Sequence, residues 1–291
     1  MININIWSIY PGTFKVSSTN SRVEVEEGLY RIEDLVNADN SEIEIRAKAS
    51  DVSYHYYSRS NPSRGVDIRG NDVSVLANTD FSASRDTIFI VHGWNNNKDS
   101  AVNYHIREAI LSKHNINVFV VDWSPVAAKT YLSAKNSVVS IGRFAADFVR
   151  SLVSRYNVRL DRVACVGHSL GAHVLIQPDP LFSVSNTDGR LDRTDARFVQ
   201  IIHTNGGLLG FEEPIGHSDY FPNGGKSQPG CGLDVAGTCA HSRAYEYYSE
   251  AILSNRNLFF ARRCTAYSDF TNGRCNSNVL STMGGYGIDK G

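Results

Sequence analysis

The chain has 291 residues, of which 42% are hydrophobic and 20% are charged, and its 29 Lys and Arg nearly balance its 30 Asp and Glu. This composition is typical of a globular protein and excludes general disorder. The charge balance argues against a nucleic-acid binder, because contacts to phosphates need an excess of basic residues. Every apolar run is shorter than the roughly 18 residues of a membrane-spanning helix, so the sequence predicts no transmembrane segment.

Residues 1–50 are predicted to form an N-terminal extension. They lack strong periodicity, and the many acidic residues between positions 24 and 44 favour a solvated segment over a binding site. Two segments at the end of this region, 41–49 and 51–59, alternate apolar and polar residues. This alternation predicts two half-buried strands.

Beyond residue 86, four short and continuous apolar runs predict buried strands: 87–91, 118–123, 162–167 and 198–204. Helical patterns separate them at 100–112 and 137–155, and the second pattern has an apolar face at steps of three and four residues. Apolar strands that alternate with helices predict a mostly parallel sheet covered by helices on both faces, which is an α/β fold.

The third run leads into Gly167-His168-Ser169-Leu170-Gly171, a G-x-S-x-G sequence directly after a predicted strand. The chain must turn sharply there from strand to helix, and glycines two residues before and after the serine leave room for the turn. The sequence therefore predicts Ser169 as a nucleophile exposed at the carboxyl end of the strand. The alternative is a plain glycine-rich turn.

Acyl transfer also needs two backbone N–H groups that face the developing negative charge, an arrangement called an oxyanion hole. One would come from Leu170, the residue after the serine. The other should come from a loop after an earlier strand, and the run 87–91 leads into His92, Gly93 and Trp94. Because Gly93 permits close approach of the backbone, we predict Trp94 N–H as the second donor, with a simple strand-end turn as the alternative.

Five cysteines are present, and Cys165 stands apart in an apolar run, where a buried free thiol is expected. The other four form two closely spaced pairs, which predict two short-loop disulfides: Cys231/Cys239 and Cys264/Cys275. A zinc site of Cys231, Cys239 and His241 is the alternative, although the C-x2-C spacing of structural zinc sites is absent. Disulfides imply an oxidising compartment, yet the N-terminus shows no secretory signal pattern.

Six motifs together resemble the pancreatic lipase family of secreted neutral lipases: FIVHGW, VVDWS, GHSLGAH, RLDRTDARFVQIIHT, GHSDYFPNGGKSQPGC and CAHSRAYEYY. The resemblance covers residues 50–287 and is strongest to the arthropod branch, which includes phospholipase A1-like members. It implies an α/β-hydrolase domain over 51–291 without the family's C-terminal β-sandwich, an extracellular location, and chemistry that requires no cofactor.

The resemblance also implies a Ser-Asp-His triad with Ser169 as nucleophile and His241 as general base. The aspartate motif of the family is missing, and the nearest acid is Asp179, ten residues after Ser169. Ten residues cannot hold a helix and a returning strand, so we expect one helix–strand unit to be missing after the turn. Asp179 could orient His241 from a new register, the triad could lack its acid, or the chain could fail to fold.

Cys231 and Cys239 match the disulfide that closes the lid of the family, and Cys264 and Cys275 match a second one. The lid here is the short segment 232–238, which resembles the phospholipase A1-like members and favours phospholipid over triglyceride. The segment RLDRTDARF resembles a structural calcium loop, in which Asp192 and Asp195 would supply carboxylates and Arg190 a backbone carbonyl. The alternative is that these acids only cap the loop.

Two classes of function follow. The first is a secreted hydrolase that cleaves lipid carboxylic esters through an acyl-enzyme on Ser169, at a membrane or droplet interface. The second is a non-catalytic lipid-binding or storage protein, like the egg-yolk proteins that resemble this family but typically lack the serine. A third alternative, a cytosolic esterase, predicts five free thiols instead of one.

Overall fold

The computed structural model describes residues 47–174, 190–254 and 259–285, and the backbone of three short N-terminal strands. The central sheet has eight strands, in the spatial order β10 (Ser218–Tyr220), β9 (Val199–Ile202), β1 (Asn3–Asn5), β8 (Val163–Gly167), β6 (Thr87–Val91), β7 (Asn117–Asp122), β4 (Ser53–Tyr57) and β5 (Val66–Arg69). From β10 to β7 all neighbours are parallel, whereas β4 is antiparallel to β7 and to β5. The prediction of a mostly parallel sheet is confirmed.

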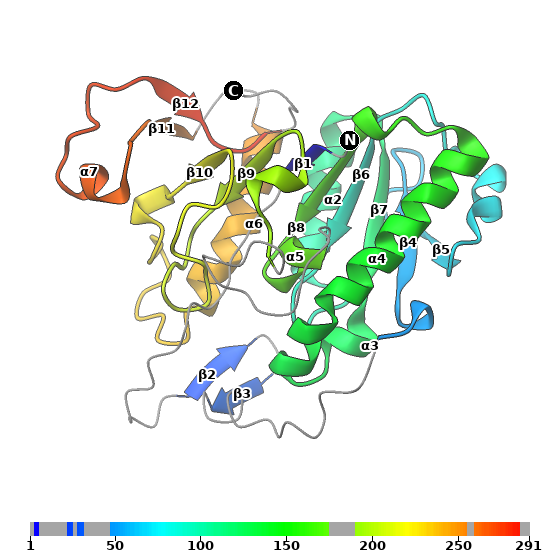
Figure 1. Cartoon of the computed structure of the whole chain (residues 1–291), viewed down its shortest axis with the longest axis horizontal. Coiled ribbons are helices and arrows are strands. Elements are labelled where there is room, and N and C mark those ends of the chain that lie inside the picture. The colour runs from blue at the N-terminus through cyan, green and yellow to red at the C-terminus, as the bar shows by residue number, and fades with distance from the viewer. Residues whose placement is uncertain are drawn as a thin grey trace.

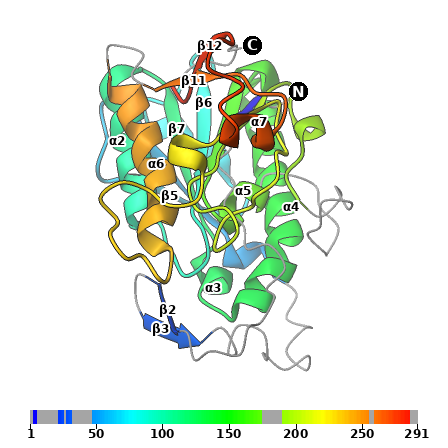
Figure 2. The same cartoon turned by 90° about the vertical axis from the view of Figure 1, so that its left-hand side faces the viewer.

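Helices cover both faces of this sheet, as Figures 1 and 2 show. Helices α2 (Ala101–Lys113) and α6 (Thr238–Leu253) pack against each other on one face, and the long helix α4 (Tyr131–Tyr156) covers the other. The described residues also form the shorter helices α3 (Ser124–Ala127), α5 (Leu170–Val174) and α7 (Tyr267–Thr271). Two small ribbons pair β2 (Arg22–Val25) with β3 (Gly28–Arg31) and β11 (Phe260–Arg262) with β12 (Leu280–Thr282).

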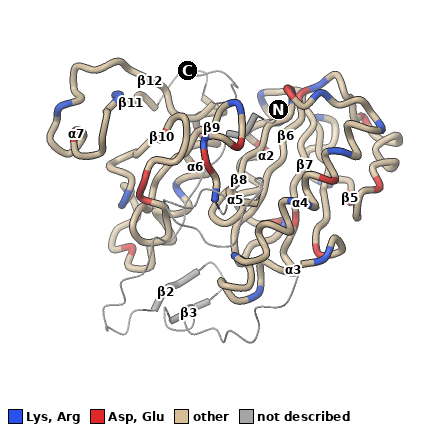
Figure 3. Tube along the Cα trace, in the orientation of Figure 1, with Lys and Arg blue, Asp and Glu red and all other residues tan. Residues whose placement is uncertain are grey.

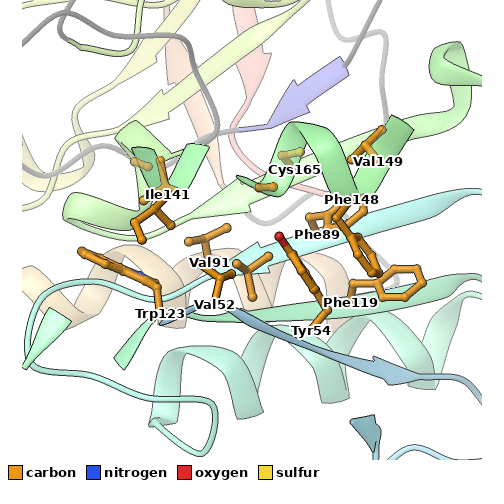
Figure 4. Close-up of a cluster of buried hydrophobic side chains, with 14 of the residues drawn as sticks. Val52, Tyr54, Phe89, Val91, Phe119, Trp123, Ile141, Phe148, Val149 and Cys165 are labelled. Atoms are coloured by element: carbon orange, nitrogen blue, oxygen red, sulfur yellow. The ribbon is translucent and has the colours of Figure 1, made fainter. Parts of the chain in front are cut away.

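The predicted apolar face of α4 is buried against the sheet, through residues that include Val138, Ile141, Ala145, Phe148 and Leu152. Figure 4 shows part of this core, in which the Tyr54 ring of β4 stacks on the Phe148 ring at a centroid distance of 3.7 Å. Burial of each such large apolar side chain stabilises the fold by about 1.5–3 kcal/mol. Strand β8 is packed on both faces, with Val163 and Cys165 in this core and Ala164 and Val166 in a second core beside α2.

One sequence expectation about the first strands needs correction. The alternation in 51–59 predicts a half-buried strand, but every residue of β4 is buried, because Tyr54 and Tyr56 pack in the core on the α4 face and Tyr57 in the core on the α2 face. Most of the segment 41–49 lies outside the described residues, and its described end leads into the 3-10 turn Ala49–Asp51. Alternation of polar and apolar residues shows that one face of a strand is polar. It does not show whether tertiary contacts bury that face.

Strand β1 belongs to the segment predicted as a solvated extension, yet it lies inside the central sheet between β8 and β9. Ile4 is opposite Cys165 of β8 and Val199 of β9. A strand that followed the turn at Ser169 would be expected near this position. Residues 175–189, which include Asp179, lie outside the described residues, so the missing helix–strand unit and the domain boundary at residue 50 stay predictions.

The cysteines pair as the sequence predicts. Disulfides join Cys231 to Cys239 and Cys264 to Cys275, and Cys165 is a buried free thiol. The zinc alternative is therefore wrong, because a disulfide-bonded sulfur is not a thiolate ligand. Lys and Arg are interspersed with Asp and Glu along the described trace (Figure 3). Within the described residues, no helix is both long and apolar enough to cross a bilayer.

Candidate active site

Ser169 stands at the sharp turn between β8 and α5, in a strained backbone conformation. Its φ of 56° lies in the left-handed region that non-glycine residues rarely adopt. The flanking glycines permit the turn, since a Cβ at Gly167 would lie 2.4 Å from the Gly171 oxygen and one at Gly171 would lie 2.3 Å from the His92 oxygen. These glycines have the predicted role, because the backbone comes too close at both positions to leave room for a side chain.

The loop after β6 lies directly against Ser169. A Cβ at Gly93 would be only 2.7 Å from the Ser169 Cβ and 3.3 Å from its Oγ, so the backbone of this loop reaches the predicted nucleophile. The next residue is Trp94, whose indole N–H donates to the Lys129 oxygen at 2.7 Å. Leu170 follows Ser169 and begins α5, where a backbone N–H has no acceptor within its own helix. The two predicted oxyanion donors therefore belong to segments next to Ser169, and their role stays a prediction.

A buried network anchors this loop to the end of β7. Nδ1 of His92 lies 2.9 Å from the Gly93 oxygen and Nε2 lies 3.1 Å from Asp122 Oδ1, while Trp123 Nε1 donates to the His92 oxygen at 2.9 Å. Burial would raise the pKa of Asp122, but hydrogen bonds from His92 and Ser124 prevail and lower it to about 2. The carboxylate is thus charged near neutral pH and holds the loop in place. Sequence reasoning missed Asp122, although it lies in the motif VVDWS.

The first turn of α6 carries His241, and the lid segment 232–238 caps this turn. The His241 N–H donates to the Gly237 oxygen at 2.8 Å. The side chain of Asp234 accepts from Cys239 N at 3.3 Å and from Ala240 N at 2.7 Å. A carboxylate at a helix N-terminus is also favoured by the helix dipole. The lid therefore fixes the start of the helix that presents His241, a role that the sequence analysis did not assign to Asp234.

His241 lies beside the nucleophile turn, although 72 positions separate it from Ser169. Its ring meets the ring of His168 at a centroid distance of 4.6 Å. Burial, and in second place His168, lower the pKa of His241 well below its ordinary value. The imidazole is therefore neutral at pH 7, the form in which a general base can accept a proton. Among the described residues, no hydrogen bond yet joins its ring to Ser169, a contact that often tightens only when substrate binds.

The Nδ1 atom of His241 is buried and has no hydrogen-bond partner among the described residues. In a Ser-His-Asp triad, this is the atom that donates to the acid. Asp179, the predicted acid, lies outside the described residues, so its role stays a prediction. Of the predicted triad, the structure brings together Ser169 and His241 and shows the ring position at which an acid would act.

The segment predicted as a calcium loop forms a capped 3-10 turn, Arg193–Asp195. Asp192 accepts from Thr194 N at 3.1 Å, Asp195 accepts from Asp192 N at 2.6 Å, and the Arg190 guanidinium lies 3.4 Å from Asp192 Oδ2. These contacts are the capping that the sequence analysis kept as its alternative. Burial raises the pKa of Asp195 to about 6 and outweighs the hydrogen bond from Asp192 N and the positive charge of Arg190, which lower it. Calcium binding stays a prediction, since hard oxygen donors are present but Arg190 already pairs with one of them.

The described fold and the strained serine at the end of β8 define the class of the protein, an α/β-hydrolase. The chain belongs to the pancreatic lipase family. The profile of the Lipase family matches residues 31–290. This result gives the protein a lipase scaffold, which confirms the resemblance.

Several curated proteins are similar to the chain. It is 32% identical to the inactive pancreatic lipase-related protein 1 of Homo sapiens, over 75% of this chain and 55% of that protein. It is 29% identical to the pancreatic triacylglycerol lipase of Oryctolagus cuniculus, over 82% of this chain and 60% of that protein. A third relative, the pancreatic lipase-related protein 2 of Bos taurus, is 28% identical over 77% of this chain and 56% of that protein. The chain thus spans little more than half the length of these relatives.

Proposed function

We propose that the chain hydrolyses carboxylic esters of lipids through an acyl-enzyme on Ser169. The observation that carries this proposal is the strained serine at the end of β8 with the neutral His241 beside it. In the first step, His241 takes the hydroxyl proton while Ser169 Oγ bonds to the ester carbonyl carbon. The resulting oxyanion is held by the N–H groups of Leu170 and Trp94.

The second half of the reaction returns the enzyme to its starting state. The protonated His241 gives its proton to the departing alcohol as the ester C–O bond breaks, which leaves an acyl group on Ser169. Water then loses a proton to His241 and attacks the acyl carbon, and the carboxylic acid departs as Ser169 regains its proton. Each proton that His241 accepts it also returns, so this chemistry requires no cofactor.

The rate depends on what orients His241. A related triad that keeps its geometry but has lost its proper acid retains about 10⁻⁴ of the turnover. We propose Asp179 for this role, since it is the nearest acid after Ser169 in the sequence. The name of one relative, inactive pancreatic lipase-related protein 1, shows that proteins similar to this chain include one described as inactive.

Exposed apolar side chains of the lid favour contact with a lipid surface. Leu233 is 93% exposed and Val235 is 64% exposed, and the disulfide Cys231–Cys239 holds both in a short loop. Exposed apolar side chains at the edge of a site are typical of interfacial binding. We propose phospholipid as the preferred substrate, because a lid of this length leaves the site open to large head groups.

A second function is lipid binding without catalysis on the same scaffold, which is favoured because Nδ1 of His241 has no partner among the described residues. In either case we propose an extracellular location, since disulfides form and persist in oxidising compartments. A structural calcium ion at Asp192 and Asp195 is the remaining part of the proposal. If it binds, added Ca²⁺ raises the melting temperature relative to chelator, and Asp195→Asn removes that increase.

The experiment that tests the proposal is labelling of the oxidised protein with a fluorophosphonate, read by intact mass and peptide mapping. We expect a single adduct on Ser169 and none in Ser169→Ala. Hydrolysis of phospholipid vesicles and of triglyceride emulsions by the wild-type protein then ranks the two substrates. If a compact, monodisperse wild-type protein forms no adduct, hydrolysis is ruled out in favour of the binding function.

A further inference from the structure

His168 links the nucleophile turn to helix α6 through a contact that no predicted catalytic role uses. Its Nε2 lies 3.2 Å from the backbone oxygen of His241, 73 positions further along the chain. Its ring also meets those of His241 and Tyr245 edge to face, at centroid distances of 4.6 and 5.1 Å. Because His241 and Tyr245 are four residues apart on one helix face, the His168 ring covers the start of α6.

The chemistry of this contact fixes the protonation of His168. A carbonyl oxygen only accepts hydrogen bonds, so the proton of the ring is on Nε2 and is donated to His241 O. His168 is only 5% exposed, and burial lowers its pKa to about 4, so the ring is neutral at pH 7. Its Nδ1 is buried and has no partner in the described part of the chain. The ring is therefore held by a single polar contact, and that contact is with the residue predicted as the base.

The backbone of His168 is itself fixed on the sheet. Its N–H donates to the Val91 oxygen at 3.1 Å, and its oxygen accepts from Gly171 N at 2.9 Å. The next residue is Ser169, whose sharp turn the flanking glycines permit. The His168 side chain therefore extends from a rigid point beside the nucleophile to the peptide group of His241.

We propose that His168 is a positioning residue, whose Nε2–H hydrogen bond to the His241 oxygen sets the separation of the base from Ser169 without touching a reacting atom. The catalytic consequence rests on the proposed hydrolase function, whereas the hydrogen bond does not. A displacement of about 1 Å between reacting groups can cost on the order of 100-fold in rate. A link between Ser169 and His241 through neighbouring groups prevents such displacement in the free enzyme.

Two substitutions of His168 separate hydrogen bonding from packing. His168→Gln keeps a side-chain N–H at a similar reach, whereas His168→Leu fills the space without a donor. The matched control is Ser249→Ala, which removes a hydrogen bond to another α6 backbone oxygen, that of Tyr245 at 2.8 Å, away from the nucleophile turn. Each folded variant is assayed with a soluble nitrophenyl ester and with the fluorophosphonate.

We expect His168→Leu to lower kcat and the labelling rate by about 10- to 100-fold with little change in KM. His168→Gln should stay within about fivefold of the wild type, and Ser249→Ala within about twofold. Equal losses in the Leu and Gln variants would overturn the proposal, because the donor would then not matter. Wild-type rates in a folded His168→Leu variant would overturn it as well.

A second measurement does not depend on activity or on folding of a variant. Two-dimensional ¹H–¹⁵N NMR of the wild-type imidazoles at pH 7 should show His168 neutral, with its proton on Nε2 and protected from solvent exchange. A proton on Nδ1 would overturn the proposal, because that tautomer cannot donate to His241 O. If the wild type forms no fluorophosphonate adduct but shows the Nε2 tautomer, the hydrolase function fails while the link between the two elements stands.

Discussion

His203 and His241 lie near the same edge of the sheet but differ in what their rings contact. His203 follows β9, and its Nδ1 lies 2.8 Å from the Phe211 oxygen and its Nε2 2.8 Å from Asp219 Oδ1. Its ring also stacks on Phe221 at a centroid distance of 4.3 Å. In contrast, the buried Nδ1 of His241 has no partner among the described residues.

This difference distinguishes a histidine with a partner at each ring nitrogen from one whose Nδ1 has no partner among the described residues. A buried polar group without a partner costs about 1–3 kcal/mol, so the described contacts give no gain in stability that would explain the position of His241. His203 repeats the histidine–carboxylate arrangement of a triad, but it is fully enclosed and lies away from the serine. A histidine–carboxylate pair is therefore not by itself the mark of the base, and proximity to the strained serine is the better criterion.

The contrast between His203 and His241 would fail if His241 were needed for stability instead of activity. We expect His241→Leu to abolish fluorophosphonate labelling, a loss on the order of 10⁴- to 10⁶-fold in rate. The free energy of unfolding in urea should change by less than about 1 kcal/mol, because the substitution removes a polar atom that has no partner in the described part of the chain. A variant that unfolds readily but still reacts would contradict the assignment.

The converse experiment removes the structural histidine. His203→Leu should lower the free energy of unfolding by about 1–3 kcal/mol, because the buried carboxylate of Asp219 loses His203 and keeps only the N–H groups of Ile215 and Gly216. The double variant with Asp219→Asn should recover part of this loss, since it removes the charge. Chemical denaturation of the single and the double variant measures the loss and the recovery. If His203→Leu were as stable as the wild type, His203 and His241 would not differ in their contribution to stability.

Strand β1 bears on both histidine sites, because it lies between β8, which leads to Ser169, and β9, which leads to His203. A strand with neighbours on both sides uses its backbone N–H groups in the sheet. Ile4→Pro should therefore cost about 3 kcal/mol in urea unfolding, whereas Ile4→Val keeps the backbone N–H and should cost much less. Equal stability of the two variants would show that β1 does not support the sheet.

The response to pH tests two buried histidines whose pKa values burial lowers. Burial lowers the pKa of His168 to about 4 and of His173 to about 3, while an unfolded histidine titrates near 6.5. Below pH 6.5 the unfolded chain binds protons that the folded chain excludes, so stability is complete above pH 6.5 and falls as the pH drops toward 4. For His168 the loss is on the order of 3 kcal/mol.

Asp195 acts in the opposite direction. Its pKa is raised to about 6, so its contribution is present at low pH and is lost as the pH rises from about 4 through 6. Urea titrations between pH 4 and 7 measure the combined effect of these groups on the free energy of unfolding. The variant His168→Gln removes the contribution of His168 from that total. An unchanged pH dependence in that variant would contradict the burial of a neutral His168.

The smallest effect is expected at the lid, which caps the helix of His241 but lies outside the chemistry. Leu233→Ser with Val235→Ser should reduce hydrolysis of vesicles or emulsions by about 10-fold and leave soluble ester hydrolysis unchanged, because only the interfacial contact is lost. Asp234→Ala serves as a contrast, since loss of the helix cap should affect both substrates. Equal losses on soluble and dispersed substrates in the double serine variant would contradict an interfacial role.

The sequence by itself determined the elements whose signals are local. Apolar runs and the 3.6-residue pattern predicted the parallel strands and the face of α4, because burial on both sides of a sheet needs continuous apolar residues. The G-x-S-x-G pattern placed the strained Ser169, since only glycines fit where the backbone of the turn comes into contact. Spacing likewise indicated the two disulfides.

The tertiary structure alone decided the rest, because it depends on contacts between residues far apart in the chain. No pattern in the segment around Ile4 indicates that it lies between β8 and β9. No spacing indicates that the His168 ring donates to the His241 oxygen, or that His203 instead of His241 pairs with a described carboxylate. These features arise because the sheet brings distant loops together at the carboxyl ends of its parallel strands. The packing of neighbouring side chains there decides which partner each histidine ring contacts.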